Sequence, residues 1–188
     1  DTDPEQVFDD VVELASHIMQ TPIALISLVD KDRQWFKANR GCPVGETPRD
    51  ISFCGHVVAD NSPLVVPDAL QDQRFLDNPL VTGDPPVRFY VGMPLMTAEG
   101  HTLGTLCAID HEPRTTTPHQ LHLLERLAWM TMDLLDLRMI TRKLTAAQRT
   151  VRERSGNLAA ANRALALHFD QLTHVLDTLE TGVIVANE

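Results

Sequence analysis

The sequence predicts an α+β fold in which an antiparallel sheet carries helices on one face and is extended by a long C-terminal coiled-coil helix. Two stretches, 23–38 and 89–109, are each two runs of strand-forming residues joined by a turn, as in β-hairpins. Apolar residues at helical spacing flank these hairpins at both ends of the globular part, and a heptad repeat follows from Leu137. Hairpins with helices gathered at the chain ends fit a sheet covered on one face.

The first helix is predicted to open at Asp3 and Pro4. Asp3 is a good N-cap, and Pro4 suits the first helical position. The segment Phe8–Ile18 then places apolar residues along one face.

Strands are predicted at 23–29 and 34–38, where branched and aromatic residues dominate. The stretch 40–50 has two Gly and two Pro, so it is expected to be a loop. A short helix at 51–59 and a short strand at 64–67 follow.

A long polar excursion, 68–86, precedes the second hairpin, 89–96 and 102–109. Loops longer than about 12–15 residues are uncommon unless functional. We therefore expect the excursion to form the wall or lid of a pocket on the face of the sheet opposite the helices.

The last helix is predicted to begin with a capping box, in which Thr117 is the cap, Pro118 the first residue and Gln120 the reciprocal partner. If it is unbroken to residue 178, it is about 60 residues and about 90 Å long. Gly156 costs only about 1 kcal/mol relative to Ala within a helix.

An apolar seam with an average spacing of 3.5 residues runs along this helix, which is typical of a coiled coil. Its apolar members are Leu137, Ile140, Leu144, Ala147, Val151, Leu158, Ala161, Leu165, Leu172, Val175 and Leu179. Arg154 and His168 are the polar members, and polar seam residues tend to fix register. One helix cannot bury its own seam, so the pattern predicts a parallel homodimer.

Composition limits the possible partners. The net charge is −10, which argues against nonspecific binding to nucleic acid or to anionic membranes. Three sparse cysteines indicate a reducing, cytoplasmic setting.

The chain starts at Asp1 and ends inside a strand-like run, 182–188, so we expect it to be a fragment of a longer protein.

Several segments in order resemble a GAF domain of a bacterial signalling protein: IALISLVDKDRQWFKANRG at 23–41, SFCGHVV at 52–58, PLVVPDALQDQRFLDNPLV at 63–81 and RFYVGMPLMTAEGHTLGTLCAID at 88–110. The last residues, DQLTHVLDTLETGVIVANE, resemble the beginning of a PAS domain. The expected organisation is a GAF domain at 1–137, a signalling coiled coil at 138–178 and a truncated PAS-like start at 179–188.

The resemblance implies a ligand pocket between the sheet and the irregular middle. Its candidate residues are Trp35, Phe53, Cys54, His56, Asp68, Phe75, Arg88 and Tyr90. For each aromatic residue, core packing is the competing interpretation. Asp68 is expected to cap the helix that follows it, and Arg88 either holds an anion or pairs with a carboxylate such as Asp84.

The alternative to a ligand sensor is a haem, metal or thiol-redox sensor that uses Cys54, His56 or Cys107. A structural zinc site needs four ligands, and only three are suggested here. Buried packing is therefore the favoured role for Cys54 and Cys107. No cofactor is predicted.

No catalytic residues are predicted, because paired carboxylates, an activated nucleophile and a phosphate-binding loop are all absent from the sequence. The expected function is a non-catalytic sensory module of a signal-transduction protein. In proteins of this kind the helix leads to an output enzyme, commonly a histidine kinase of a two-component system or a diguanylate cyclase.

Overall fold

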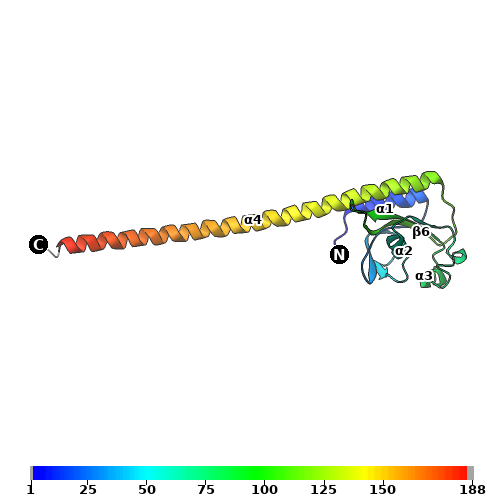
Figure 1. Ribbon diagram of the computed structural model, residues 1–188, viewed down its shortest axis with the longest axis horizontal. Coiled ribbons are helices and arrows are strands. Elements are labelled where there is room, and N and C mark those ends of the chain that lie inside the picture. The colour runs from blue at the N-terminus through cyan, green and yellow to red at the C-terminus, as the bar shows by residue number, and fades with distance from the viewer. Residues whose placement is uncertain (1, 186–188) are drawn as a thin grey trace. The chain divides into compact units, whose positions relative to one another are not determined.

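The computed structural model describes the backbone of residues 2–185 and the side chains of residues 2–173 (Figure 1). The chain divides into two units, one that ends at Asp136 and one that begins at Leu137. Among the described residues, the first unit holds all the strands, and the second is the continuation of helix α4, Pro118–Val185.

A six-stranded antiparallel sheet forms the centre of the first unit, with the strand order β3-β2-β1-β6-β5-β4. The strands are β1 (Ile23–Val29), β2 (Arg33–Arg40), β3 (Glu46–Pro48), β4 (Leu64–Val66), β5 (Phe89–Met96) and β6 (Thr102–Asp110). Both predicted hairpins are present, and β1 pairs with β6 to join them. The short strand β3 lies inside the stretch that was expected to be only a loop.

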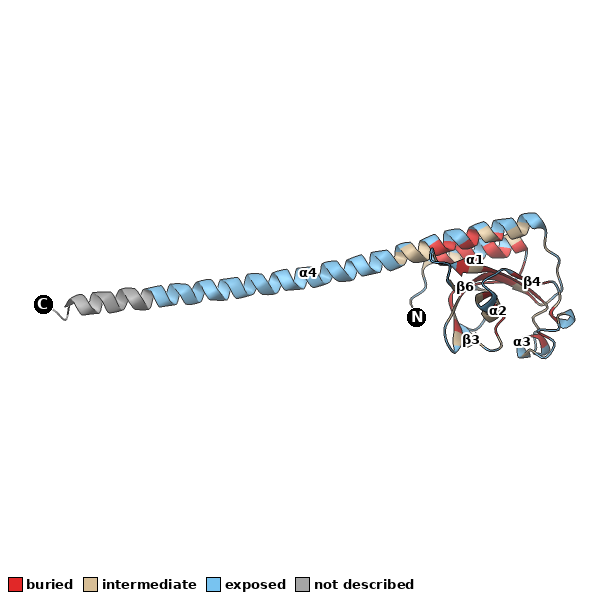
Figure 2. Cartoon of the chain, in the orientation of Figure 1, coloured by how far each residue is buried: buried red, intermediate tan, exposed pale blue. Residues whose placement is uncertain are grey.

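One face of the sheet is covered by α1 (Gln6–Met19) and by the first turns of α4 (Figure 2). The stripe on α1 buries Phe8, Val11, Val12 and Ala15 against the sheet, as the helical spacing predicted. The N-cap of α1 is Glu5. The prediction that Asp3 caps this helix and Pro4 opens it is therefore wrong. The Asp3 carbonyl instead accepts a hydrogen bond from the buried Lys37 ammonium at 2.8 Å.

The opposite face is covered by α2 (Phe53–Asp60), the short helices η1 (Ala69–Gln71) and α3 (Pro79–Thr82), and the loops around them. Side chains alternate along the strands, so neighbouring residues serve different cores. For example, Leu106 and Ala108 of β6 face α1, whereas Cys107 faces α2. The predicted fold class is confirmed, and α2 adds a helix on the second face.

Helix α4 begins with the predicted capping box. The Thr117 hydroxyl accepts from the Gln120 amide N–H at 3.2 Å, and the Gln120 side-chain oxygen accepts from the Thr117 amide N–H at 3.0 Å. Leu124, Leu127 and Ala128 then join the core on the α1 face.

Beyond Asp136, the described side chains of α4 are exposed almost throughout (Figure 2). The helix continues to Val185, so residues 182–185 are helical where a strand was expected. The rest of that segment, and the side chains of seam residues Val175 and Leu179, lie outside the described part of the chain.

Candidate functional site

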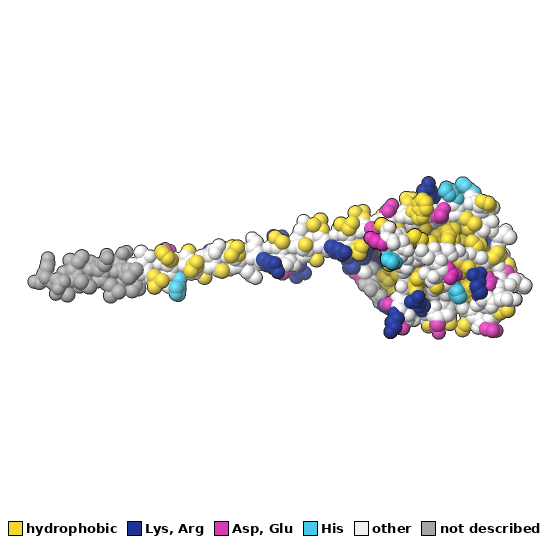
Figure 3. Space-filling view, in the orientation of Figure 1, with side chains coloured by type: hydrophobic (Ala, Val, Ile, Leu, Met, Phe, Trp, Pro, Cys, Tyr) yellow, Lys and Arg dark blue, Asp and Glu magenta, His cyan; other side chains and the backbone are white. Residues whose placement is uncertain are grey.

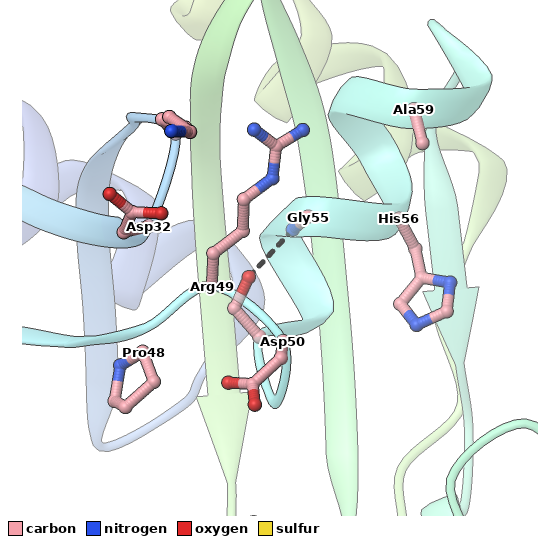
Figure 4. A pocket seen from close by; sticks show the side chains of 9 residues that line it. Asp32, Pro48, Arg49, Asp50, Gly55, His56 and Ala59 are labelled. Carbon is pink, nitrogen blue, oxygen red and sulfur yellow. Dashed lines mark hydrogen bonds between the residues drawn. The ribbon is translucent and has the colours of Figure 1, made fainter.

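A cleft of about 600 Å³ opens beside α2, and three segments form its walls (Figure 4). The β1–β2 turn supplies Lys31 and Asp32. Strand β3 and the loop after it supply Pro48, Arg49 and Asp50. Helix α2 and its N-cap supply Ser52, Gly55, His56 and Ala59.

Hydrogen bonds between these segments hold the walls of the cleft in place. Arg49 makes two contacts with the β1–β2 turn: its amide N–H donates to the Asp32 carbonyl at 3.1 Å and its Nη1 donates to the Asp30 carbonyl at 2.9 Å. The Ser52 amide donates to the Arg49 carbonyl at 3.0 Å, and the Ser52 hydroxyl accepts from the Gly55 amide at 2.8 Å. The loop before α2 is thereby tied both to the turn and to the helix.

The cleft carries charges of both signs. Lys31 and Arg49 provide cations, Asp32 and Asp50 provide carboxylates, and His56 adds an imidazole from α2 (Figure 4). Specific ligand sites combine a concave surface with a few convergent polar groups. This arrangement suits the binding of a small polar molecule.

Of the predicted pocket residues, only His56 lines this cleft. Three predicted aromatic residues instead stack in the core behind α2. The ring centroids of Phe53 and Phe75 are 4.1 Å apart, and those of Phe53 and Tyr90 are 5.0 Å apart. His56 also meets the Phe75 ring edge-on at 4.9 Å, so its imidazole lies between the cleft and the aromatic core.

The remaining predicted residues also lie away from the cleft lining. Trp35 is half-buried on β2, opposite Leu28 on one side and Glu46 on the other. Asp68 caps η1 as expected, since its carboxylate accepts from the Leu70 amide at 3.2 Å.

Arg88 forms a two-pronged ion pair with Asp68, with both nitrogen–oxygen distances at 2.8 Å. The carboxylate partner is therefore Asp68 and not Asp84, which had been suggested from the sequence. The hydrogen bonds from the Arg88 guanidinium lower the pKa of Asp68, and the same pair raises the pKa of Arg88.

Eight lining residues were missed by sequence reasoning: Lys31, Asp32, Pro48, Arg49, Asp50, Ser52, Gly55 and Ala59. Two signals were available, because the segments 30–32 and 40–50 were both recognised as turn or loop, and loops often carry binding residues. The sequence did not reveal that β3 pairs with β2 and so brings the loop next to the turn.

Cys54 and Cys107 meet in the core on the α2 face, with their sulfur atoms 3.8 Å apart. His56 faces the cleft, so the three residues do not converge on one point. Within the described residues, no group of three or more His, Cys, Asp and Glu side chains is placed to hold a metal ion.

Comparison with known sequences identifies the family. The GAF domain family matches residues 3–130, and the chain belongs to this family. As a GAF domain, the first unit is a regulatory, sensory module.

One curated relative is the cyclic di-GMP phosphodiesterase PA2567 of Pseudomonas aeruginosa. It is 50% identical over 110 residues, which cover 58% of this chain and 19% of that protein. The match therefore spans about a fifth of the relative's length.

Solved GAF domains share the fold at low sequence identity. The GAF domain of an Acinetobacter phosphoenolpyruvate-protein phosphotransferase is 18% identical, with a TM-score of 0.61 over 72% of this chain and 83% of that chain. The second GAF domain of DevS from Mycobacterium smegmatis is 18% identical, with a TM-score of 0.56 over 76% of this chain and 99% of that chain. At this level of identity the likeness establishes the fold alone.

Among the described residues, no helix combines the length and the apolar composition needed to cross a bilayer.

Proposed function

We propose that the chain is the input module of a dimeric bacterial signalling protein. A small ligand or a partner binds the GAF domain, and α4 forms a parallel coiled coil with a second copy of the chain. That coiled coil carries the state of the GAF domain toward a PAS domain, which begins near residue 179, and an output enzyme. In this proposal the chain binds neither nucleic acid nor a membrane.

The observation that carries this proposal is the exposure of the apolar seam of α4, and Figure 3 shows hydrophobic side chains at the surface along the described part of this helix. In the single chain Leu144 is 57% exposed, Val151 67% and Leu165 68%. Leu137, Ile140, Leu158 and Leu172 are exposed to a similar degree. Apolar residues that recur at heptad spacing along so exposed a helix are stabilised by burial against a second helix.

Ligand binding affects signalling only if the ligand binds two conformations of the protein with different affinity. Helix α2 is the element best placed to respond, because it contributes both to the cleft and to the core on β1, β5 and β6. We expect a ligand in the cleft to favour one position of α2 on the sheet.

The relative supports the choice of output. Since PA2567 is a cyclic di-GMP phosphodiesterase that extends far beyond the matched segment, we favour an output that turns over cyclic di-GMP. A histidine kinase and a diguanylate cyclase are the alternatives from the family resemblance.

Cross-linking through a cysteine in the seam tests the parallel dimer. A Leu144→Cys variant places identical thiols face to face in a parallel, in-register pair, whereas an antiparallel pair separates them. Ala146→Cys is the matched control, because residue 146 is exposed but lies outside the seam. Mild oxidation should produce covalent dimers of Leu144→Cys well above the level seen for Ala146→Cys. Equal cross-linking of the two variants would contradict the proposed pairing.

A further inference from the structure

Helix α2 presents two different surfaces within eight residues. Gly55, His56 and Ala59 line the cleft, whereas Cys54 is 2% exposed and faces the sheet. A displacement of Cys54 therefore displaces one wall of the cleft.

The partner of Cys54 is on the sheet. Cys107 of β6 is 0% exposed, and its sulfur lies 3.8 Å from that of Cys54. Both cysteines are free thiols. A disulfide requires a sulfur–sulfur distance of about 2.05 Å, so the two atoms need to approach by less than about 2 Å. The two cysteines are 53 residues apart in the sequence, so the bond would link α2 to the hairpin formed by β5 and β6.

Polar groups converge on Cys54 although it is buried. The Thr105 hydroxyl lies 3.0 Å from the sulfur and the Tyr90 hydroxyl lies 3.4 Å from it. Both hydroxyls can donate to a thiolate. A packing cysteine among apolar side chains needs no such donors.

The two thiols differ in acidity. Burial raises the pKa of Cys54, but hydrogen bonds from Cys107, Thr105, Tyr90 and Ser27 outweigh it and bring the pKa to about 6. The hydrogen bond to Cys54 and burial both raise the pKa of Cys107 well above its ordinary range. This difference separates an attacking thiolate from a resolving thiol.

We infer that Cys54 and Cys107 form a reversible disulfide in response to a peroxide, and that the bond changes the cleft by moving α2. This goes beyond the proposed relay and does not depend on dimerisation. A small oxidant is required, because burial of both sulfurs excludes a protein disulfide from direct attack.

The chemistry balances with peroxide as the oxidant. The Cys54 thiolate attacks one peroxide oxygen, the S–O bond forms as the O–O bond breaks, and the departing hydroxide takes up the proton that the Cys54 thiol had released. Cys107 then attacks the Cys54 sulfur, the S–S bond forms as the S–O bond breaks, and the Cys107 proton leaves with the hydroxyl as water. Overall, two thiols lose two electrons and one peroxide becomes two waters.

Cys42 provides the internal control. It is half-buried and packs at the edge of the same core, so it is the more accessible thiol. If accessibility alone decided reactivity, Cys42 would react first. The inference predicts instead that Cys54 and Cys107 are consumed together.

The test treats the folded, reduced chain with hydrogen peroxide and then maps its peptides by mass spectrometry. We expect the intact mass to fall by two hydrogen atoms, with one linked peptide joining Cys54 to Cys107, in both the natural chain and the Cys42→Ser variant. In Cys107→Ser, the sulfenic acid on Cys54 should persist long enough to be trapped by dimedone. A reductant should restore both thiols of the natural chain.

Hydrogen exchange of α2 supplies the second readout. The amides of Phe53–Asp60 should change their exchange rates at least threefold between the reduced and the oxidised chain, while those of Leu121–Leu135 should not. The inference is overturned if peroxide leaves both buried thiols free, if Cys42 enters the linked peptide, or if the bond forms without altering exchange in α2. None of these results bears on the coiled coil, so this inference and the proposed relay fail independently.

Discussion

Two leucines on α4 provide a matched test of the coiled-coil seam. Leu165 is 68% exposed and Leu167 is 66% exposed in the single chain, so the two side chains are buried to the same small extent in the monomer. The heptad repeat distinguishes them, since residue 165 lies in the seam and residue 167 lies outside it. We predict that Leu165→Ala weakens the dimer and that Leu167→Ala does not.

The size of the effect follows from burial. Complete burial of a leucine side chain is worth about 1.5–3 kcal/mol, and about two thirds of Leu165 remains to be buried. Each chain therefore gains about 1–2 kcal/mol at this position, and the dimer contains two copies. Because alanine retains part of that gain, Leu165→Ala should cost about 1.5–3 kcal/mol per dimer. The dissociation constant should rise about 10- to 150-fold.

Sedimentation equilibrium over a range of protein concentrations measures this constant directly. Both substitutions make the same change in helix propensity, so that contribution cancels between the variants. Leu167→Ala should keep its dissociation constant within about threefold of the natural chain, a difference of about 0.7 kcal/mol. Equal weakening of the two variants, or no weakening of either, would refute the heptad assignment.

Three further predictions concern the globular unit and are measured by urea denaturation. Phe75→Ala should lower the free energy of unfolding by about 3–5 kcal/mol, because Phe75 is fully buried and its removal leaves a cavity; a loss below about 1 kcal/mol would mean that the aromatic core collapses freely. Gly104→Ala should cost about 3 kcal/mol, since a Cβ there would lie 1.9 Å from the Ser27 carbonyl oxygen; natural stability would show that β6 shifts easily. Asp68→Asn should be less stable than the natural chain at pH 7. Arg88 lowers the pKa of Asp68, so the stabilisation is present above about pH 4 and is lost as the pH falls through the folded pKa; the two chains should converge at low pH, and a constant gap would contradict the ion-pair explanation.

Most of the fold could be predicted because its signals are local. The capping box at Thr117 and the stripe on Phe8–Ile18 each depend on residues only three or four positions apart. The N-cap at Asp3 failed for a tertiary reason, because Lys37 on β2 reaches the N-terminal segment and binds the Asp3 carbonyl and the Glu5 carboxylate. That contact spans more than thirty residues, and the N-terminal sequence alone does not reveal it.

The cleft was less predictable than the fold because strand pairing assembles it. His56 was identified because it lies within SFCGHVV, 52–58, one of the segments that resemble the family, and it does line the cleft. Arg49 was not among the predicted pocket residues, and its contacts with the β1–β2 turn depend on where β3 pairs. The aromatic residues Phe53, Phe75 and Tyr90 were pocket candidates with core packing as the competing interpretation, and they stack in the core on the α2 face of the sheet.

The mass of the molecule in dilute solution shows whether α4 joins two copies of the chain. The full chain should be compared by analytical ultracentrifugation with a chain that ends at Asp136, where the globular unit ends. We expect the full chain to sediment as a dimer and the shortened chain to lose this association. If the two chains show the same state of association, α4 does not join two copies and the proposed relay is wrong.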